Sequence, residues 1–213
     1  MKYEKFLKLK FLVLLLVIFS ACADKTAQND AYQNSAAPVR YLKIEDVDFK
    51  NFSYSYGEND KNKVTLSNGE KPYGGLNDLA FSFNKTQFAD LTKDGNDEAV
   101  VVLLHGNGAI ASNVVAVYTL ENQQPKKLWS FYLGSETNGR LKDIYVVEDN
   151  LVVEVFGKNE FDKAQNEFRF SPDFNPAEAF CCPKNFTRFN FNWNGERFVS
   201  REKPQVSEYK PEN

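Results

Sequence analysis

Turn-forming residues divide most of this chain into short segments, and their spacing limits its fold more than any other feature. They occur at Asn68-Gly69, Asp94-Gly95, Gly106-Asn107-Gly108, Asp149-Asn150 and Asn194-Gly195. Short strands at this spacing favour an antiparallel meander. Aromatic residues make up 15% of the chain, with 19 Phe and 10 Tyr, and such side chains favour strands over helices. The sequence therefore predicts an all-β or nearly all-β fold, as a sandwich, an open barrel or a partial propeller.

Three of these segments carry more detailed predictions. The run Ala99 to Leu104 is apolar throughout and mostly β-branched, which is typical of a central strand covered on both faces. A two-residue turn at Asn194-Gly195 places Phe191 opposite Phe198, and one at Asp149-Asn150 places Val146 opposite Val153. We therefore expect an aromatic pair in the first hairpin and a buried position for the second.

The N-terminus has the pattern of an export signal. Residues 1–10 carry four lysines against one glutamate, and the apolar run Phe11 to Phe19 follows. This run is too short to span a bilayer, so a cleaved signal-peptide helix is expected. The run ends in Ile18-Phe19-Ser20-Ala21-Cys22, which resembles the lipobox of bacterial lipoproteins, although Phe19 replaces the usual Leu. The resemblance implies cleavage before Cys22 and lipidation of that residue; the alternative is a simple cleaved signal that leaves a thiol.

The composition of successive segments predicts how the chain is divided into regions. We expect a signal peptide at residues 1–21, a lipidated cysteine and flexible linker at 22–38, one β-rich domain at 39–203 and a disordered tail at 204–213. The whole chain has a formal charge of −3, and removal of the signal peptide takes away four bases and one acid to leave −6. This sign is unfavourable for binding a phosphate backbone, so nucleic acid is not an expected partner. We expect the protein to contact the membrane through its N-terminal lipid.

One loop has the residue pattern of a calcium site. Oxygen-bearing side chains recur at alternate positions around a glycine, Gly95, and such hard donors suit Ca²⁺. The expected ligands are Asp90, Thr92, Asp94, Asn96 and Glu98. An EF-hand is excluded because its closing Glu would fall at Val101. The segment instead resembles the strand-loop-strand calcium loops of FG-GAP and integrin-type repeats, with Thr92 in place of the usual Asp or Asn. The alternative is a turn in which Asp90 and Asp94 bond their own backbone.

Two further motifs carry chemistry. Cys181 and Cys182 are adjacent, so they form either a strained vicinal disulfide or a pair of thiols, and a redox switch is the functional alternative. His105 follows an apolar run and precedes a Gly-rich loop, as in α/β-hydrolases and dinucleotide-binding folds. A Gly-x-Ser-x-Gly elbow and a following helix are both missing, so we interpret this stretch as a loop between two strands.

Together these motifs resemble uncharacterised bacterial envelope lipoproteins of the LppP/LprE type over residues 75–200. The resemblance depends on the lipobox, the Asp90-to-Val100 segment, Leu128-Trp129-Ser130-Phe131, Cys181-Cys182-Pro183 and the Arg188-to-Gly195 hairpin. It implies a location in the cell envelope, and Ala23 after Cys22 favours the outer membrane. We expect a non-catalytic binding or structural domain with a protein or glycan partner, stabilised by calcium if the loop binds it. The alternative is an envelope enzyme, either a metal-assisted hydrolase at the Asp90 loop or a thiol redox protein.

Overall fold

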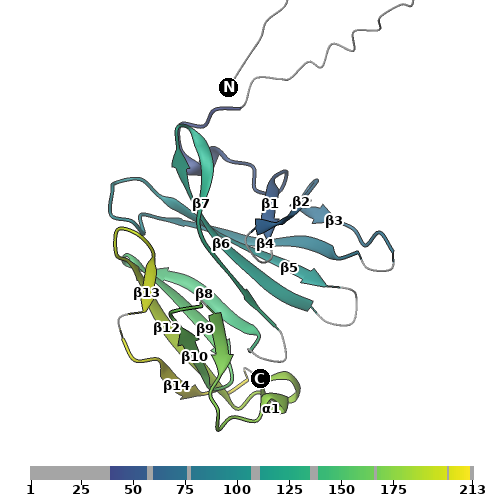
Figure 1. Ribbon diagram of the computed structural model, residues 1–213, viewed down its shortest axis with the longest axis vertical. Coiled ribbons are helices and arrows are strands. Elements are labelled where there is room, and N and C mark those ends of the chain that lie inside the picture. The colour runs from purple at the N-terminus through teal and green to yellow at the C-terminus, as the bar shows by residue number, and fades with distance from the viewer. Residues whose placement is uncertain are drawn as a thin grey trace, which may run out of the picture. The chain divides into compact units, whose positions relative to one another are not determined.

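Most strands form where the sequence is rich in aromatic and β-branched residues. Figure 1 shows the computed structural model, which describes residues 39–56, 60–75, 78–106, 111–134, 139–165, 167–200 and 202–211. All of these belong to one compact unit, residues 38–213. Two five-stranded antiparallel sheets and two short hairpins account for the described strands, with a single α-helix, α1 (Pro176–Cys181). The all-β prediction is confirmed, and the sheets pack as in a sandwich.

The first sheet, called here the N-terminal sheet, is a meander in which neighbouring strands follow one another in the chain. Its order is β3 (Glu70–Lys71), β4 (Ala80–Ala89), β5 (Glu98–Gly106), β6 (Ala111–Glu121) and β7 (Gln124–Leu133). The Asn68-Gly69 turn joins β3 to the preceding segment with φ of 53° and 85°, as a tight hairpin turn requires.

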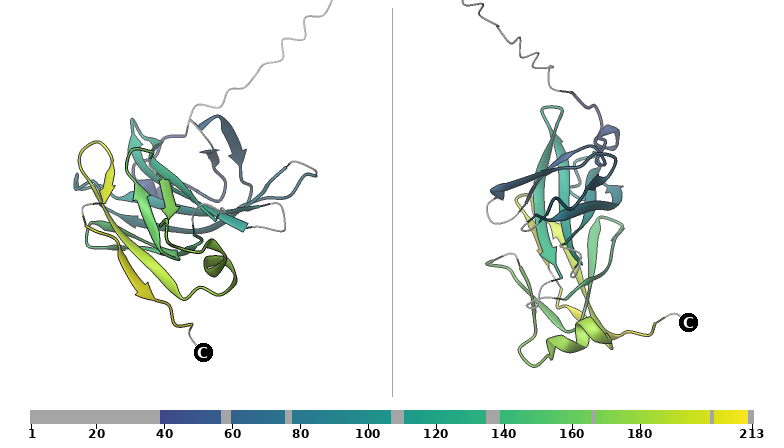
Figure 2. Two further views of the ribbon diagram at one scale, coloured as in Figure 1. Left: turned by 60° about the horizontal axis from the view of Figure 1, so that its bottom comes forward. Right: turned by 90° about the vertical axis from the view of Figure 1, so that its right-hand side faces the viewer.

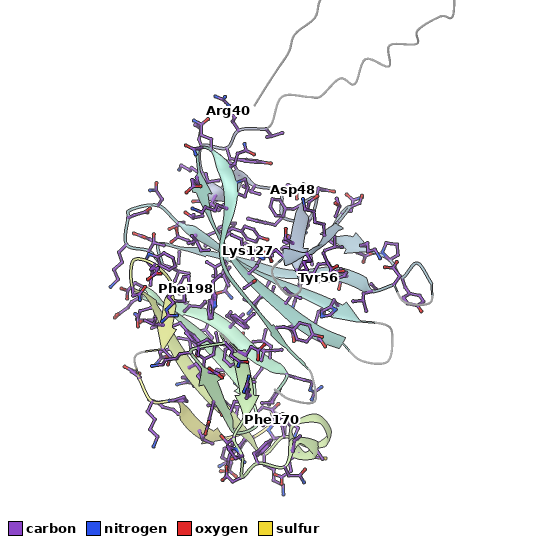
Figure 3. The ribbon with its side chains drawn as sticks, in the orientation of Figure 1. Arg40, Asp48, Tyr56, Lys127, Phe170 and Phe198 are labelled. Carbon is purple, nitrogen blue, oxygen red and sulfur yellow. The ribbon has the colours of Figure 1, made fainter. Side chains whose placement is uncertain are left out.

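Central strand β5 is buried on both faces, as its apolar run predicted. Val100 and Val102 point into one core, and Val101 and Leu103 point into the other. The second core lies under η1 (Ile44–Asp46) and the hairpin of β1 (Ser53–Tyr56) and β2 (Asn62–Thr65). Lys127 of β7, labelled in Figure 3, donates a hydrogen bond of 3.1 Å to the backbone carbonyl of Ser55 and so ties this hairpin to the sheet.

The second sheet, called here the C-terminal sheet, combines strands that are distant in sequence. It is built from β8 (Leu141–Val147), β9 (Asn150–Phe156), β12 (Asn185–Trp193), β13 (Phe198–Ser200) and β14 (Gln205–Glu208). Between β9 and β12 the chain forms β10 (Asn159–Asp162), β11 (Glu167–Phe170) and α1. In both views of Figure 2, α1 lies at the end of the unit away from β1 and β2.

A core of aliphatic and aromatic side chains joins the two sheets. It is formed by Val100, Val102, Val115, Val117, Trp129, Phe131 and Leu133 from one sheet and Ile144, Leu151, Val153, Val155, Phe189, Phe191 and Phe198 from the other. Phe168 of β11 closes the core, with its ring centroid 5.0 Å from those of Phe131 and Phe189. Burying these side chains is the main force that holds the sheets together.

Both hairpin registers differ from the prediction by two residues. Asn194 accepts hydrogen bonds from the amides of Glu196 and Arg197 at 3.0 and 2.8 Å, which makes a four-residue loop and pairs Trp193 with Phe198. In the other hairpin, Glu148 adopts a φ of 57° and the turn falls one residue earlier, so that Val146 pairs with Leu151. A shift of two residues leaves every side chain on the same face of the sheet.

The end of the chain also differs from the prediction. Residues 205–208 were expected in a disordered tail, but they form β14, which pairs with β12 from Asn185 to Arg188. Exposed backbone donors of β12 beyond the end of β13 provide the partner for this polar segment. The predicted signal peptide, Cys22 and the predicted linker lie outside the described residues. Within the described part, no helix is long and apolar enough to cross a membrane.

Candidate functional site

The predicted calcium loop connects β4 to β5 and is held by its own backbone. Asp90 accepts hydrogen bonds from the amides of Asp94 and Gly95 at 3.1 and 3.0 Å. Asp94 accepts from the amide and the side chain of Asn96 at 2.8 and 3.1 Å. Gly95 has a φ of 88°, a left-handed conformation that its missing side chain permits. These bonds match the alternative interpretation, in which the carboxylates cap a turn.

Glu98 is the anchor of this loop and is fully buried at 0% exposure. Its Oε2 accepts hydrogen bonds from the amides of Leu91 and Thr92 at 3.0 and 2.9 Å, and Thr119 of β6 bonds the same carboxylate. Burial raises the pKa of Glu98, and these hydrogen bonds offset only part of the effect. The carboxylate therefore faces the interior and fixes the start of the loop.

The predicted ligands do not gather around one space. A hollow of about 340 Å³ beside the loop is lined by Asp94 and Asn96, together with Glu45 and Lys43 from the segment around η1. Asp90, Thr92 and Glu98 do not line it. Among the described residues, no group of three or more His, Cys, Asp and Glu side chains is placed to hold a metal. The observed arrangement does not fit the expected five-ligand site, and calcium binding stays a prediction.

The cysteine pair lies at the C-terminal end of α1. Asn175 caps the other end by accepting a hydrogen bond of 3.1 Å from the amide of Ala177, and Pro176 occupies the first helical position. Cys181 is the last residue of α1, and exposed Cys182 is its C-cap. The side chain of Cys181 lies outside what the structure describes. The choice between a vicinal disulfide and two thiols therefore stays a prediction.

His105 lies near the end of β5, in a row of aromatic rings rather than beside a nucleophile. Its ring stacks on Phe81 at 5.2 Å and contacts Tyr132 at 4.8 Å. Both ring nitrogens are buried and have no hydrogen-bond partner within the described residues, and burial lowers the pKa of His105. The backbone continues through Gly106, which pairs with Ala111 of antiparallel β6. This fits the interpretation of a loop between two strands.

A site that sequence reasoning missed lies on the outer face of the C-terminal sheet. Glu154 of β9 points away from the core yet is only 2% exposed. Arg188 of β12 donates to its Oε1 through Nε at 2.8 Å and Nη2 at 2.7 Å. The Tyr145 hydroxyl donates to the same oxygen at 3.1 Å, and Lys142 pairs with Oε2. The two strands that flank β9, namely β8 and β12, thus place polar side chains on one buried carboxylate.

Opposing effects set the electrostatics of this cluster. Burial raises the pKa of Glu154, but hydrogen bonds from Lys142 and Arg188 outweigh burial and keep it below its usual range. The bond to Glu154 raises the pKa of Arg188, whereas burial and the nearby carboxylate raise that of Tyr145. Arg188 and Tyr145 therefore keep their protons at neutral pH, and Glu154 stays ionised.

Two hollows open on this outer face, one on each side of Glu154. The first, of about 310 Å³, is lined by Arg188 and Tyr145 together with Asn190, Asn192 and Glu202. The second, of about 610 Å³, is lined by Lys142 and by the rings of Phe156, Phe186 and Tyr209. Because Lys142 and Arg188 both bind Glu154, one carboxylate connects the walls of the two hollows.

One signal in the sequence could have indicated this face. Glu154 interrupts an otherwise apolar strand, Leu151 to Phe156, and a charged residue there needs buried partners. Its three partners lie 9, 12 and 34 residues away along the chain, so only the pairing of β9 with both neighbours reveals them.

Comparisons with known proteins give this chain no relative. No protein-family model, no curated protein and no solved structure matches it.

Proposed function

We propose that this chain is a lipid-anchored protein of the bacterial cell envelope whose β domain binds a ligand, without catalysis, on the outer face of the C-terminal sheet. The lipobox-like segment ending at Cys22 supports the anchor. The observation that carries the binding role is the buried Glu154 on a face turned away from the core. The Glu154 carboxylate fixes the positions of Lys142, Tyr145 and Arg188 beside two open hollows before any ligand binds.

A structural role alone explains this cluster poorly. Holding a carboxylate away from water costs free energy that an apolar residue would not cost, so a buried ion pair is weak evidence for stability. On β9, the strand that carries Glu154, the side chains of Leu151, Val153 and Val155 already pack into the core. The cluster does fix the positions of Arg188 and Tyr145, which is what a recognition surface needs.

The charge states of the cluster support binding rather than proton transfer. A general acid or base works best when its pKa lies near the operating pH. The pKa of Glu154 is shifted downward and those of Arg188 and Tyr145 upward, away from neutrality in each case.

Photo-crosslinking in cells tests the binding face. We would place benzoylphenylalanine at Val147, which is 49% exposed and lines the first hollow, and at Tyr73, 50% exposed on the segment before β4, as the control. We expect a crosslinked product from position 147 that is missing from position 73 and is lost with Asn190→Ala and Asn192→Ala. Equal products at both positions, or none, would contradict the proposal.

The anchor is tested separately. Wild-type protein should incorporate an alkyne fatty acid and fractionate with membranes, whereas Cys22→Ser should do neither. Lipid incorporation that persists in Cys22→Ser would remove the anchor from the proposal.

A further inference from the structure

Building on the proposed function, we infer that the ligand of the outer face is an uncharged oligosaccharide segment. The polar side chains that line the first hollow include planar amides, a guanidinium and a carboxylate, contributed by Asn190, Asn192, Arg188 and Glu202. Each sugar hydroxyl both donates and accepts a hydrogen bond, so it is matched by a surface that presents both donors and acceptors in fixed places.

The amides of the first hollow are already oriented. The side-chain nitrogen of Asn190 donates to Glu202 at 2.7 Å, and that of Asn192 donates to Asn150. Each amide therefore turns its nitrogen toward a protein partner, and its carbonyl oxygen is not engaged by the described residues. Val152 supplies an apolar floor, because it lines the same hollow and is 4% exposed. Oriented polar groups around an apolar floor are typical of small-ligand sites.

The second hollow adds aromatic surface. Phe156 and Tyr209 meet edge to face with ring centroids 5.0 Å apart, and Phe186 lies under the ammonium of Lys142 at 4.3 Å. All three rings are half-buried and line the hollow, so part of each remains available. The C–H groups of a sugar ring are apolar and pack on aromatic surface of this kind. An extended ligand would place hydroxyls in the first hollow and a ring face in the second.

Charge balance excludes a strongly charged polymer. The two hollows are lined by three basic side chains, Lys142, Arg188 and Lys210, and three acidic ones, Asp143, Glu202 and Glu208. Several of these charges are already matched: Lys142 and Arg188 pair with Glu154, and Asp143 pairs with Lys85. No excess of either sign remains to attract a polyanion or a polycation.

The size and openness of the face favour a chain over a small enclosed molecule. The first hollow is at the lower end of the range for small-molecule pockets, about 300–1,000 Å³, and both are open to solvent. They share the Glu154 cluster as a common wall, so a single extended ligand can reach both.

Isothermal titration calorimetry tests this inference on the full-length lipidated protein in a detergent that carries no sugar. The probes are cellohexaose, maltohexaose and hexa-N-acetylchitohexaose, with polygalacturonate as the charged comparison. We expect saturable binding of at least one uncharged probe. The Asn190→Ala, Asn192→Ala double variant should bind about tenfold more weakly, because it removes the two amides that would hydrogen-bond the sugar hydroxyls. Phe186→Ala should also weaken binding.

A matched control separates recognition from folding. Asn62→Ala removes the same side chain from an exposed strand position on β2, outside both hollows, and should leave affinity unchanged. If none of the three oligosaccharides binds, or if only polygalacturonate binds, the inference is overturned. A Val147 crosslink to a polypeptide would leave the proposed function standing while refuting the sugar ligand. Equal loss of affinity in the Asn62 control would also refute it.

Discussion

Glu98 offers the sharpest test of how the loop after β4 is held. If it is an anchor for backbone amides, its acceptor oxygen matters and its charge does not. Replacement by Ala removes the acceptor for the amides of Leu91, which is 0% exposed, and Thr92, which is half-buried. Replacement by Gln keeps an oxygen where Oε2 lies and puts a donor near the Thr92 hydroxyl, which is 3.4 Å from Oε1.

The expected magnitudes follow from these contacts. A buried donor left without a partner costs about 1–3 kcal/mol, so losing the acceptor for one buried and one half-buried amide should cost about 3 kcal/mol in Glu98→Ala. For a domain of this size, that corresponds to a fall in Tm of about 6–12 °C. Glu98→Gln should lie within about 1 kcal/mol of wild type at pH 7, because it retains the acceptor and removes a charge that burial disfavours.

The pH dependence has a defined sign. Because the folded pKa of Glu98 is raised, the folded state holds its proton more tightly than the unfolded state does. Wild-type protein should therefore gain stability relative to Glu98→Gln as pH falls from 7 through the folded pKa toward about 4.3, the value of an unperturbed Glu.

Urea unfolding followed by tryptophan fluorescence measures these differences, with EDTA and with excess calcium. The calcium-site interpretation makes the opposite prediction for Gln, since an amide is a poorer calcium ligand than a carboxylate. If Glu98→Gln is as unstable as Glu98→Ala, and calcium stabilises only the wild type, the anchor interpretation is wrong.

Three further predictions concern other parts of the fold. His105→Phe should retain or raise the free energy of unfolding at pH 7, because it removes two buried nitrogens without partners. Wild type should lose stability as pH falls below about 6.5, because the pKa of this lone His is lowered in the folded state and the unfolded state binds the proton first. His105→Phe should not show this loss, and melts at several pH values measure both effects. Glu154→Gln should flatten the loss of stability in acid, because a lowered carboxyl pKa contributes stability above about pH 4.3 that is lost as pH falls through the folded pKa; a slope unchanged from wild type would count against the cluster. Gly134→Ala should destabilise by more than about 1 kcal/mol in urea unfolding, because φ is 112° and an added Cβ would lie 2.9 Å from the Ser112 backbone; Gly95→Ala, with φ of 88° and open space around it, is the control for strain alone.

The local pattern was enough to predict the strands and their faces. Alternation along β12 places Phe189 and Phe191 inside and Arg188 outside, and the structure confirms this. The apolar run of β5 likewise predicted burial on both faces. Such features depend on a repeat of two residues within one strand, which no partner is needed to define.

Only the tertiary structure determined the features that depend on how strands pair, namely the hairpin registers, the surroundings of Glu98 and the cluster around Glu154. The hairpin registers differ from the predicted ones by two residues because hydrogen bonds to the Asn194 side chain and the positive φ of Glu148 fix the turns at other positions. This shift leaves the pattern of buried faces unchanged. Glu98 had the spacing of a metal ligand, but the fold turned it inward onto backbone amides. The site around Glu154 exists only because β9 pairs with β8 on one side and β12 on the other, which brings distant basic side chains to one carboxylate.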